Sequence, residues 1–430
     1  MQTPSPDLQT YRRFFPSLSQ TIQEYPVVYF DNPGGTQVPS AVLDAMTTYL
    51  TRANANTGGA FANSRRTDAI IAEARTTMAD FLNADADEII FGANMTTLTF
   101  AISRALGRAF QPGDEILVTT LDHDANIAPW LALRENDVVI QIADIDPATC
   151  TLNMDDLHSK LSPRTKLVAI GYASNAVGTI NDLATIITWA REVGALVFVD
   201  AVQYAPHGPI DVRALDCDFL ACSAYKFFGP HLGILYGKRP LLEQLAAYKV
   251  RPAPNQPPDK FETGTLNHEG IAGLLGALDY LTMLGRDHTD LYPDEYADWS
   301  GRRRALKLAM HAIQEYERGL VAYLLQHLSS IPGLSLLGMT RPEDLPRRVP
   351  TVACISNCYI PRDMARELGE RGIFTWDGNY YAMALMERLG LGEHGALRIG
   401  LAHYNTIEEI DRLLVVLREL HTEVPLSQDA

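Results

Sequence analysis

The chain has 430 residues, of which 47% are hydrophobic and 20% are charged, so a folded protein with a large core and two or three domains is expected. Its 36 lysines and arginines against 52 aspartates and glutamates give a formal net charge of −16. A chain this acidic is repelled by phosphate backbones and anionic lipids, so we expect neither nucleic acid nor a membrane as a partner.

The cysteines and the first residues bear on the compartment. The five cysteines (Cys150, Cys217, Cys222, Cys354 and Cys358) are odd in number and form no C-x-x-C pair, which is typical of a reduced compartment. The stretch MQTPSPDLQTYRRFFPS has no apolar signal core, and no apolar run reaches the length of a membrane span. We therefore expect a cytoplasmic protein, with Cys354 and Cys358 on one face of a strand as small buried side chains.

The first half of the chain alternates helical and strand patterns. Residues 40–52 and 67–82 have helical periodicity, with Ser40 as the expected cap, and the Gly- and Asn-rich segment 54–61 between them is a loop. From residue 88 onward, short apolar runs alternate with predicted helices over 97–110, 126–136, 154–161 and 183–193. This alternation predicts a mostly parallel sheet with helices on both faces, the α/β fold class.

The second half follows a different order. The acidic segment 287–298 is interpreted as a solvated linker near a domain boundary, with a metal site as the less favoured reading. A long amphipathic helix is expected over 301–328, and short strands then alternate with predicted helices over 361–371, 380–389 and 406–421. We divide the chain into an arm at residues 1–28, a large domain at 29–285 and a small α+β domain at 286–430.

Lys226 stands at the end of an apolar strand pattern in DCDFLACSAYKFFGPHLGILYG, and the turn FFGP follows it. A lysine between aromatic side chains is poorly solvated, and lost solvation lowers the pKa of its ammonium group. The neutral amine can then form an imine with a carbonyl compound. The alternative is a surface lysine whose aliphatic stem covers apolar neighbours.

Asp200 ends the preceding apolar run ALVFV, and Gln203 follows three residues later. In an open parallel sheet, ligands bind beyond the carboxyl ends of the strands. An aspartate there, with a lysine on a following strand, is the pair that pyridoxal 5'-phosphate needs: the carboxylate keeps the pyridine nitrogen protonated and the amine carries the cofactor. Taken alone, Asp200 could equally cap a helix.

Three further segments follow predicted strands. In FGANMTT, Thr96 and Thr97 could bind phosphate at a helix N-terminus or merely cap that helix. In LDHDAN, His123 could stack on a cofactor ring or carry protons, and a metal site is less favoured because no further ligand cluster is present. Asn175, after KLVAIGYAS, could reach a cofactor oxygen or simply form a turn.

Arg398 lies in ALRIGLA, where apolar residues at alternating positions face the core. Arg398 therefore points to the other face, together with Gly400 and Ala402, whose small side chains leave room for a ligand. Its planar guanidinium suits a substrate carboxylate, and a surface ion pair is the alternative.

The order of these motifs resembles the class V aminotransferases, and within that superfamily the cysteine desulfurases and selenocysteine lyases. The matching motifs are Thr-Thr, DHDAN, SNAVGT, VDAVQ, S-x-x-K-x-x-GP, FETGT and R-x-x-x-A-x-YNT, spread over residues 29–417. The resemblance implies fold type I of the pyridoxal-phosphate enzymes, with a seven-stranded, mostly parallel sheet in the cofactor-binding large domain and a smaller α+β C-terminal domain. It also implies a homodimer with shared active sites.

The resemblance further implies roles for single residues. Lys226 would form the internal aldimine, Asp200 would pair with the pyridine nitrogen, and His123 would stack on the ring. Gln203, assisted by Asn175, would contact the ring oxygen. The other implied contacts are with the cofactor at Thr96, Thr97, Ser223, Tyr225 and, from the partner subunit, Thr265, and with the substrate at Arg398, Gly35 and Asn175.

One stretch departs from the resemblance. The family's desulfurases carry R-T-G-H-H-C-A-M-P on a mobile loop, where the cysteine takes up sulfur. The matching stretch here is WDGNYYAMA, with Tyr381 at the cysteine position and Trp376 at the arginine position. A phenol cannot form a persulfide, because it has no thiolate to attack sulfur. Tyr225 also replaces the usual histidine before the lysine, and Gly58-Gly59 replaces a His-Arg pair.

We therefore expect an enzyme that acts on an amino acid, of unspecified side chain, through a quinonoid, with Lys226 as the base. The first expectation is a β-eliminating C–S lyase without persulfide transfer. The alternative is an epimerase or aminotransferase of the isopenicillin N epimerase type, with Tyr381 or Tyr380 as the acid on the opposite face. A true cysteine desulfurase with a relocated nucleophile, and a non-catalytic scaffold, are less favoured.

Overall fold

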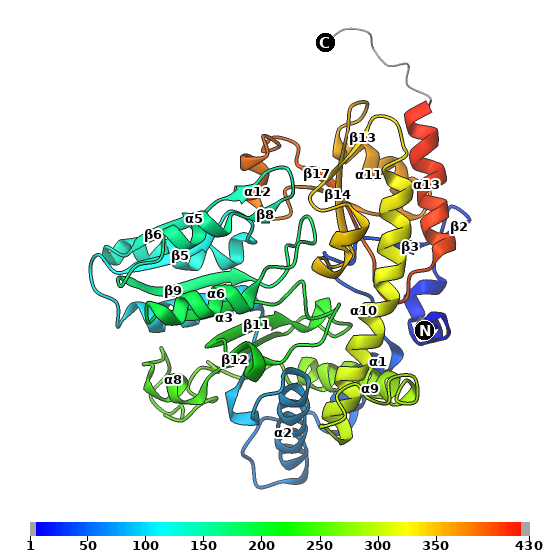
Figure 1. Ribbon diagram of the computed structural model, residues 1–430. Coiled ribbons are helices and arrows are strands. Elements are labelled where there is room, and N and C mark those ends of the chain that lie inside the picture. The colour runs from blue at the N-terminus through cyan, green and yellow to red at the C-terminus, as the bar shows by residue number, and fades with distance from the viewer. Residues whose placement is uncertain (1–5, 423–430) are drawn as a thin grey trace.

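Seven strands form the central sheet, in the order β4-β12-β11-β10-β9-β5-β6 (Figure 1). They are β4 (Ile89–Gly92), β5 (Glu115–Thr119), β6 (Val139–Ala143), β9 (Thr165–Gly171), β10 (Leu196–Asp200), β11 (Phe219–Ser223) and β12 (Gly233–Gly237). β12 is antiparallel to both neighbours, and the other pairs are parallel. The computed structural model, which describes residues 6–422, thus confirms the predicted α/β class and seven-stranded sheet.

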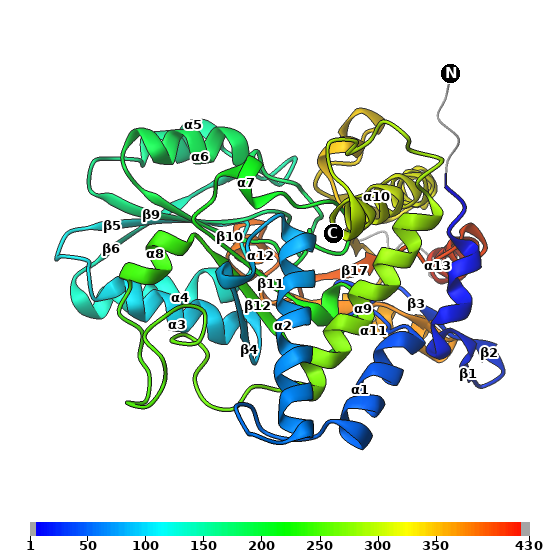
Figure 2. The ribbon, with the colours of Figure 1, turned by 90° about the horizontal axis from the view of Figure 1, so that it is seen from below.

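Helices cover both faces of this sheet (Figure 2). α3 (Met95–Gly107) lies on one face, and α5 (Met154–Ser159) and α6 (Leu183–Glu192) lie on the other. The inner strands are therefore buried on both sides, which explains why their sequences are continuous apolar runs. A further helix, α9 (His268–Asp287), packs against both α1 (Ser40–Arg52) and α2 (Ala62–Leu82).

A second sheet lies in the C-terminal part, in the order β13-β14-β17-β16 with antiparallel pairing. Its strands are β13 (Leu334–Leu337), β14 (Thr351–Ser356), β16 (Trp376–Gly378) and β17 (Ala396–Gly400). It shares a separate apolar core with α10 (Gly301–Leu328), α11 (Pro361–Glu370) and α13 (Ile407–Thr422). Near the start of the chain, β3 (Val28–Tyr29) pairs with β15 (Ile373–Phe374). The division at residues 28 and 285 stays a prediction.

Three predicted helices differ from the observed ones. α2 begins at Ala62 rather than at residue 67. The helix predicted over 126–136 is instead three short pieces, η4 (Asp124–Asn126), α4 (Ala128–Leu131) and η5 (Ala132–Asn136), because Pro129 starts a new helix rather than continuing one. The helix predicted over 380–389 is only α12 (Met383–Arg388). Tyr380 and Tyr381 have φ values of +54° and +59°, which a right-handed helix cannot contain.

Two smaller predictions are also wrong. Ser40 does not cap α1: it is the first helical residue, and Pro39 occupies the cap position. Cys358 lies beyond the end of β14 and does not share a strand face with the buried Cys354. In the acidic segment 287–298 the acidic side chains are exposed, as a solvated segment requires, although Tyr292 is buried, and its place at a domain boundary stays a prediction.

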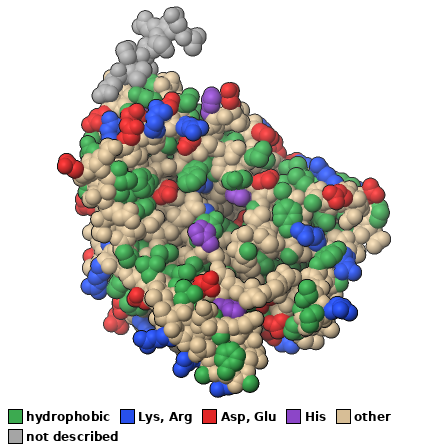
Figure 3. All heavy atoms as spheres, turned by 180° about the vertical axis from the view of Figure 1, so that it is seen from behind, with side chains coloured by type: hydrophobic (Ala, Val, Ile, Leu, Met, Phe, Trp, Pro, Cys, Tyr) green, Lys and Arg blue, Asp and Glu red, His purple; other side chains and the backbone are tan. Residues whose placement is uncertain are grey.

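Among residues 6–422, no helix is long and apolar enough to cross a membrane, and no three His, Cys, Asp or Glu side chains are grouped so as to hold a metal ion. Over the described part of the face in Figure 3, basic, acidic and apolar side chains are interspersed.

Candidate active site

A cavity of about 900 Å³ opens at the carboxyl ends of β9, β10 and β11, where β16 and β17 of the small sheet face the central sheet. Ligands bind at this edge in open α/β sheets. The cavity brings together most of the predicted site residues, namely Thr96, His123, Asn175, Asp200, Gln203, Ser223, Tyr225, Lys226, Tyr381 and Arg398. Three other predicted residues, Gly35, Thr97 and Thr265, lie outside its described lining.

Lys226 ends the short turn η6 (Ala224–Lys226) directly after β11, and its side chain is 6% exposed. The buried Phe227 and Phe228 anchor the chain on the other side of it. Burial lowers the pKa of Lys226 to about 7, and the charge of Arg398 adds to this effect. Its Nζ donates a hydrogen bond to the carbonyl oxygen of Pro33. The surface-lysine alternative is therefore wrong, and a poorly solvated amine faces the cavity.

Asp200 is the last residue of β10 and is 7% exposed. Its Oδ1 accepts a hydrogen bond from the N–H of Val202 at 2.9 Å. Burial raises the pKa of Asp200 to about 6, whereas this hydrogen bond and the charge of Lys226 oppose the rise. A cationic group in the cavity would lower that pKa further, so the carboxylate is placed to hold one.

His123 follows β5, which is separated from β10 by β9 in the sheet, and its Nδ1 accepts a hydrogen bond from the N–H of Ala125 at 3.0 Å. This bond leaves the proton of the neutral ring on Nε2. Burial lowers the pKa of His123 to about 4, with further contributions from the charges of Lys226 and Arg398, so the ring is neutral at pH 7. The ring of Tyr381 stacks on it, with 5.5 Å between the centroids.

The N-terminus of α3 opens on the cavity at Thr96. The residue that caps this helix is Asn94, whose Oδ1 accepts from the N–H and the hydroxyl of Thr97 at 2.8 and 2.9 Å. The Thr97 hydroxyl is therefore used inside the cap, and Thr96 lies closer to the cavity. Free N–H groups and the helix dipole make this end suitable for a phosphate group.

Arg398 is 4% exposed, so the surface ion-pair alternative is wrong. Its Nη1 donates to the carbonyl oxygen of Asn175 at 2.9 Å, and its guanidinium carbon lies 4.4 Å from the centroid of the Tyr380 ring. Burial lowers the pKa of Arg398 to about 10, which leaves it charged at neutral pH. Its Nε has no hydrogen-bond partner among the described residues, so a bound carboxylate could supply one.

Asn175 and Gln203 were predicted to contact the cofactor, and both line the cavity. Here their amide groups bond to the backbone: Asn175 Nδ2 donates to the carbonyl oxygen of Tyr380 at 2.8 Å, and Gln203 Nε2 donates to that of Pro33 at 2.9 Å. The Oδ1 of Asn175 is buried without a partner among the described residues. Asn175 therefore keeps one free polar atom for a ligand.

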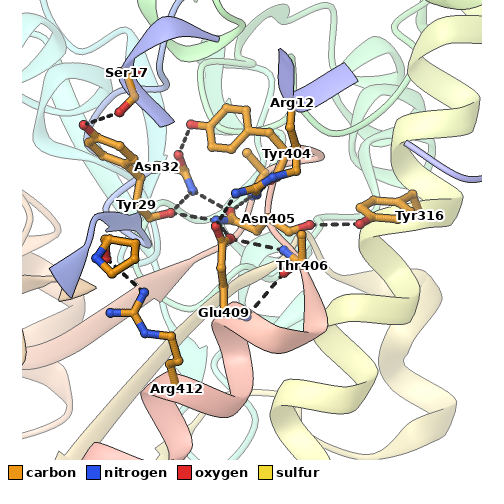
Figure 4. Close-up of polar contacts among 12 residues, drawn as sticks. Arg12, Ser17, Tyr29, Asn32, Tyr316, Tyr404, Asn405, Thr406, Glu409 and Arg412 are labelled. Atoms are coloured by element: carbon orange, nitrogen blue, oxygen red, sulfur yellow. Dashed lines mark hydrogen bonds and ion pairs between the residues drawn. The ribbon is translucent and has the colours of Figure 1, made fainter. Parts of the chain in front are cut away.

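A buried network holds the turn that carries Pro33 (Figure 4). Asn32 Nδ2 donates to Asn405 Oδ1 at 3.1 Å, and the hydroxyl of Tyr404 donates to Asn32 Oδ1. These bonds join the start of the chain to the segment just before α13. The carbonyl that anchors Lys226 is thus positioned by residues from the far end of the sequence.

Sequence reasoning missed the roles of three residues at the site. Pro33 accepts a hydrogen bond from Lys226, the ring of Tyr380 packs against the guanidinium of Arg398, and the carboxyl group of Asp31 lies near both cations. The Oδ1 of Asp31 is buried without a partner among the described residues. Burial raises the pKa of Asp31 to about 6, and the charges of Arg398 and Lys226 oppose the rise. The only sequence signal at Asp31 was the turn DNPGG that follows the strand.

A family model described as aminotransferase class-V matches residues 28–303 and 294–413. The chain belongs to the class V aminotransferase family. A cysteine desulfurase of Pectobacterium atrosepticum is 32% identical, and the match covers 96% of this chain and 98% of that protein. The aminotransferase-like protein FGM3 of Gibberella zeae is 33% identical, with 97% and 99% covered.

Solved structures agree with this assignment. The cysteine desulfurase CsdA of Escherichia coli has a TM-score of 0.80 and 28% identity, with 98% of this chain and all of that chain covered. The chain spans 58–65% of the length of three other curated relatives that it matches. Class V aminotransferases are pyridoxal-phosphate enzymes of fold type I, and the predictions of this family and this fold are confirmed.

Four features of the residues in the cavity fit pyridoxal phosphate. Lys226 offers a poorly solvated amine, and Asp200 a buried carboxylate for the pyridine nitrogen. The N-terminus of α3 at Thr96 suits the phosphate group. The Oδ1 of Asn175, which has no partner among the described residues, can accept a hydrogen bond from a bound ligand. When bound, the cofactor supplies an electron sink for charge that develops at a substrate Cα.

The pKa of Lys226 predicts how cofactor uptake depends on pH. The neutral amine attacks the aldehyde, and a lysine with a pKa of about 7 is neutral above that pH. The rate at which the apoprotein fixes pyridoxal phosphate should therefore rise from pH 5 to about 7 and level off above pH 8. Stopped-flow absorbance with borohydride trapping measures it. A rate that keeps rising to about pH 10, as for an exposed lysine, would contradict the burial of this amine.

Proposed function

We propose that the protein is a pyridoxal-phosphate lyase that cleaves a C–S or related bond of an amino acid by β-elimination, without passing sulfur to one of its own cysteines. The supporting observation is the place of the cysteines: none of the five is among the residues that line the cavity. Four are buried, and burial raises the pKa of each of their thiols. The stretch that resembles the desulfurase loop contributes Tyr381 to the cavity instead.

Different residues of the cavity would bind the substrate, remove its Cα proton and stabilise the cofactor ring during β-elimination. Arg398 binds the substrate carboxylate and orients the Cα–H bond toward Lys226, and the free Oδ1 of Asn175 accepts a hydrogen bond from a donor of the cofactor or the substrate. The neutral amine of Lys226 takes the Cα proton, and Asp200 holds the positive charge of the cofactor ring. The leaving group departs with the electrons of its bond to Cβ, and hydrolysis of the aminoacrylate yields pyruvate and ammonia.

Epimerisation is the second candidate because Tyr381 is exposed to the cavity and stacks on His123. Tyr380 cannot easily serve as the acid: it is 6% exposed, and its hydroxyl donates to the carbonyl oxygen of Ala396. If Tyr381 is an acid, Tyr381→Phe abolishes inversion at Cα while pyruvate formation stays within about threefold. A relocated sulfur nucleophile and a non-catalytic scaffold have no support from the cavity.

Product analysis tests the proposed function. With L-cysteine or an S-alkyl cysteine, we expect pyruvate and ammonia in equal amounts, no alanine, and no added sulfur on the protein by mass spectrometry. A desulfurase would instead release alanine and carry a persulfide. Stoichiometric alanine together with sulfur on any of the five cysteines would overturn the proposal.

We also propose a homodimer in which Thr265 reaches the partner's phosphate site. Glu262, in the same FETGT segment, is tied to Arg75 at 2.8 Å and to the N–H of Phe91 at 2.8 Å, whereas Thr265 is exposed and outside its own cavity. Thr265→Ala should weaken pyridoxal-phosphate binding about tenfold. The matched control Thr263→Ala, in the same exposed segment, should not. A monomer with full cofactor occupancy in sedimentation analysis would contradict the dimer.

A further inference from the structure

We infer that the amino-acid substrate carries a bulky, uncharged apolar group on its side chain, seated against Trp376 and Tyr381. This inference rests on the proposed function, because it assumes that Arg398 binds the substrate carboxylate. It narrows the substrate class of the same site.

Trp376 stands beside Arg398. The two residues are directly opposite each other in the β16–β17 pair, so their side chains leave the same face of the small sheet. Gly34 lies between them: a Cβ built there would be 3.5 Å from Trp376 Cε3 and 3.7 Å from Arg398 Nη2. A substrate held by Arg398 therefore lies next to the indole, which is 50% exposed although it lines the cavity.

Tyr381 presents a second aromatic face and is 69% exposed. Its left-handed backbone is held from two sides: its carbonyl oxygen accepts from the N–H of Asp124 at 2.7 Å, and its own N–H donates to Asn379 Oδ1 at 3.0 Å. A non-glycine residue in this conformation is strained, and such strain persists at ligand sites where surrounding bonds enforce it. The ring is therefore preorganised over His123.

The exposed aromatic faces favour a large side chain. The cavity of about 900 Å³ holds the cofactor and the substrate together, and Trp376 and Tyr381 lie in the part of its lining that the cofactor contacts do not use. A cysteine-sized substrate would leave both aromatic faces in water. An apolar group that covers them removes that surface from water and gains affinity in proportion to the area covered.

The charges of the lining disfavour an anionic group. The two cations of the cavity, Lys226 and Arg398, are assigned to the cofactor and the carboxylate. Asp124 and Glu393 also line it, so an anionic side chain would be repelled. Asp377, next to Trp376, also lines the cavity, but its side chain leaves the opposite face of β16 from the indole because successive strand residues alternate.

The test compares L-cysteine thioethers on the holoenzyme. Dissociation constants come from the absorbance change of the bound cofactor, and turnover from pyruvate release. We expect S-benzyl-L-cysteine to bind at least about tenfold more tightly than S-methyl-L-cysteine. The S-propyl compound should fall between these two, and both S-(2-carboxyethyl)- and S-(2-aminoethyl)-L-cysteine should bind more weakly than S-propyl.

Two variants tie the preference to the indole. Trp376→Ala should reduce the benzyl-to-methyl ratio to about threefold or less, whereas Trp376→Phe should keep most of it. Trp189→Ala is the matched control, since this half-buried tryptophan packs on His158 away from the cavity, and it should leave the ratio unchanged.

Three results would overturn the inference: equal binding of the benzyl and methyl compounds, a ratio that survives Trp376→Ala, or tighter binding of the aminoethyl than of the propyl compound. Failure of the proposed function looks different. Tight, Trp376-dependent binding of S-benzyl-L-cysteine without pyruvate would contradict the lyase and leave the side-chain class standing. Pyruvate released from all thioethers at equal kcat/KM would contradict the side-chain class and leave the lyase standing.

Discussion

Replacement of Lys226 by alanine is expected to remove covalent attachment of the cofactor and to lower turnover at least about a thousandfold, because the variant loses both the attacking amine and the base for the Cα proton. Borohydride reduction of the wild-type holoenzyme, followed by peptide mass spectrometry, should place a pyridoxyl group on Lys226. The variant should carry none.

The chain contains its own matched control in Lys307. This lysine is 1% exposed, and burial lowers its pKa to about 7, as for Lys226. Its Nζ donates to the carbonyl oxygens of Phe81 and Ile210, and it does not line the cavity. A pyridoxyl group on Lys307 in the wild type would mean that a low pKa alone selects the lysine, and the assignment of the cavity would fail.

Replacement of Asp200 by alanine is expected to lower turnover at least about a hundredfold, the scale on which enzymes lose rate when one electrostatic partner of the reacting system is removed. Without the carboxylate, the cofactor ring loses its proton and much of its capacity as an electron sink. Steady-state turnover of an S-alkyl cysteine measures the loss, and the cofactor's absorbance spectrum should show the unprotonated ring.

The control variant Asp122→Asn removes a different buried carboxyl group. It therefore separates the effect of Asp200 on the cofactor ring from the effect of losing any buried carboxyl group. Asp122 is buried near Asp200, but its oxygens accept from the Thr119 hydroxyl and from Asn126 Nδ2. Asparagine can keep part of these bonds, so a loss of less than about tenfold is expected. Equal losses in both variants would show that Asp200 acts only through the local structure.

Local patterns predicted many elements correctly. The helix over 40–52 and the long helix over 301–328 have the predicted bounds, since their apolar periodicity begins and ends at clear signals. Lys226 and Asp200 were found from the sequence because each lies at the carboxyl end of an apolar strand, and strand ends meet at one edge of a parallel sheet.

Other features depend on contacts that no local pattern contains. The segment NYYAMA reads as helical, yet Tyr380 and Tyr381 are left-handed because Asn175 and Asp124 bond to their carbonyl oxygens from another part of the chain. Thr97 matches a phosphate-binding motif, yet Asn94 takes both of its donors in the helix cap. In each case a competing hydrogen-bond partner decided the conformation.

The sequence by itself determined the α/β class, the family and the side chains that make the chemistry possible. Strand alternation, motif order and residue type can all be recognised along the chain without knowledge of its three-dimensional contacts. Only the tertiary structure decided how those side chains are held. Arg398 rests on Tyr380 and bonds to Asn175, which is 223 residues away, and Lys226 donates to Pro33, which is 193 residues away. Such distant groups meet only when the two sheets pack together, and burial at that junction is what lowers the pKa of Lys226 to about 7.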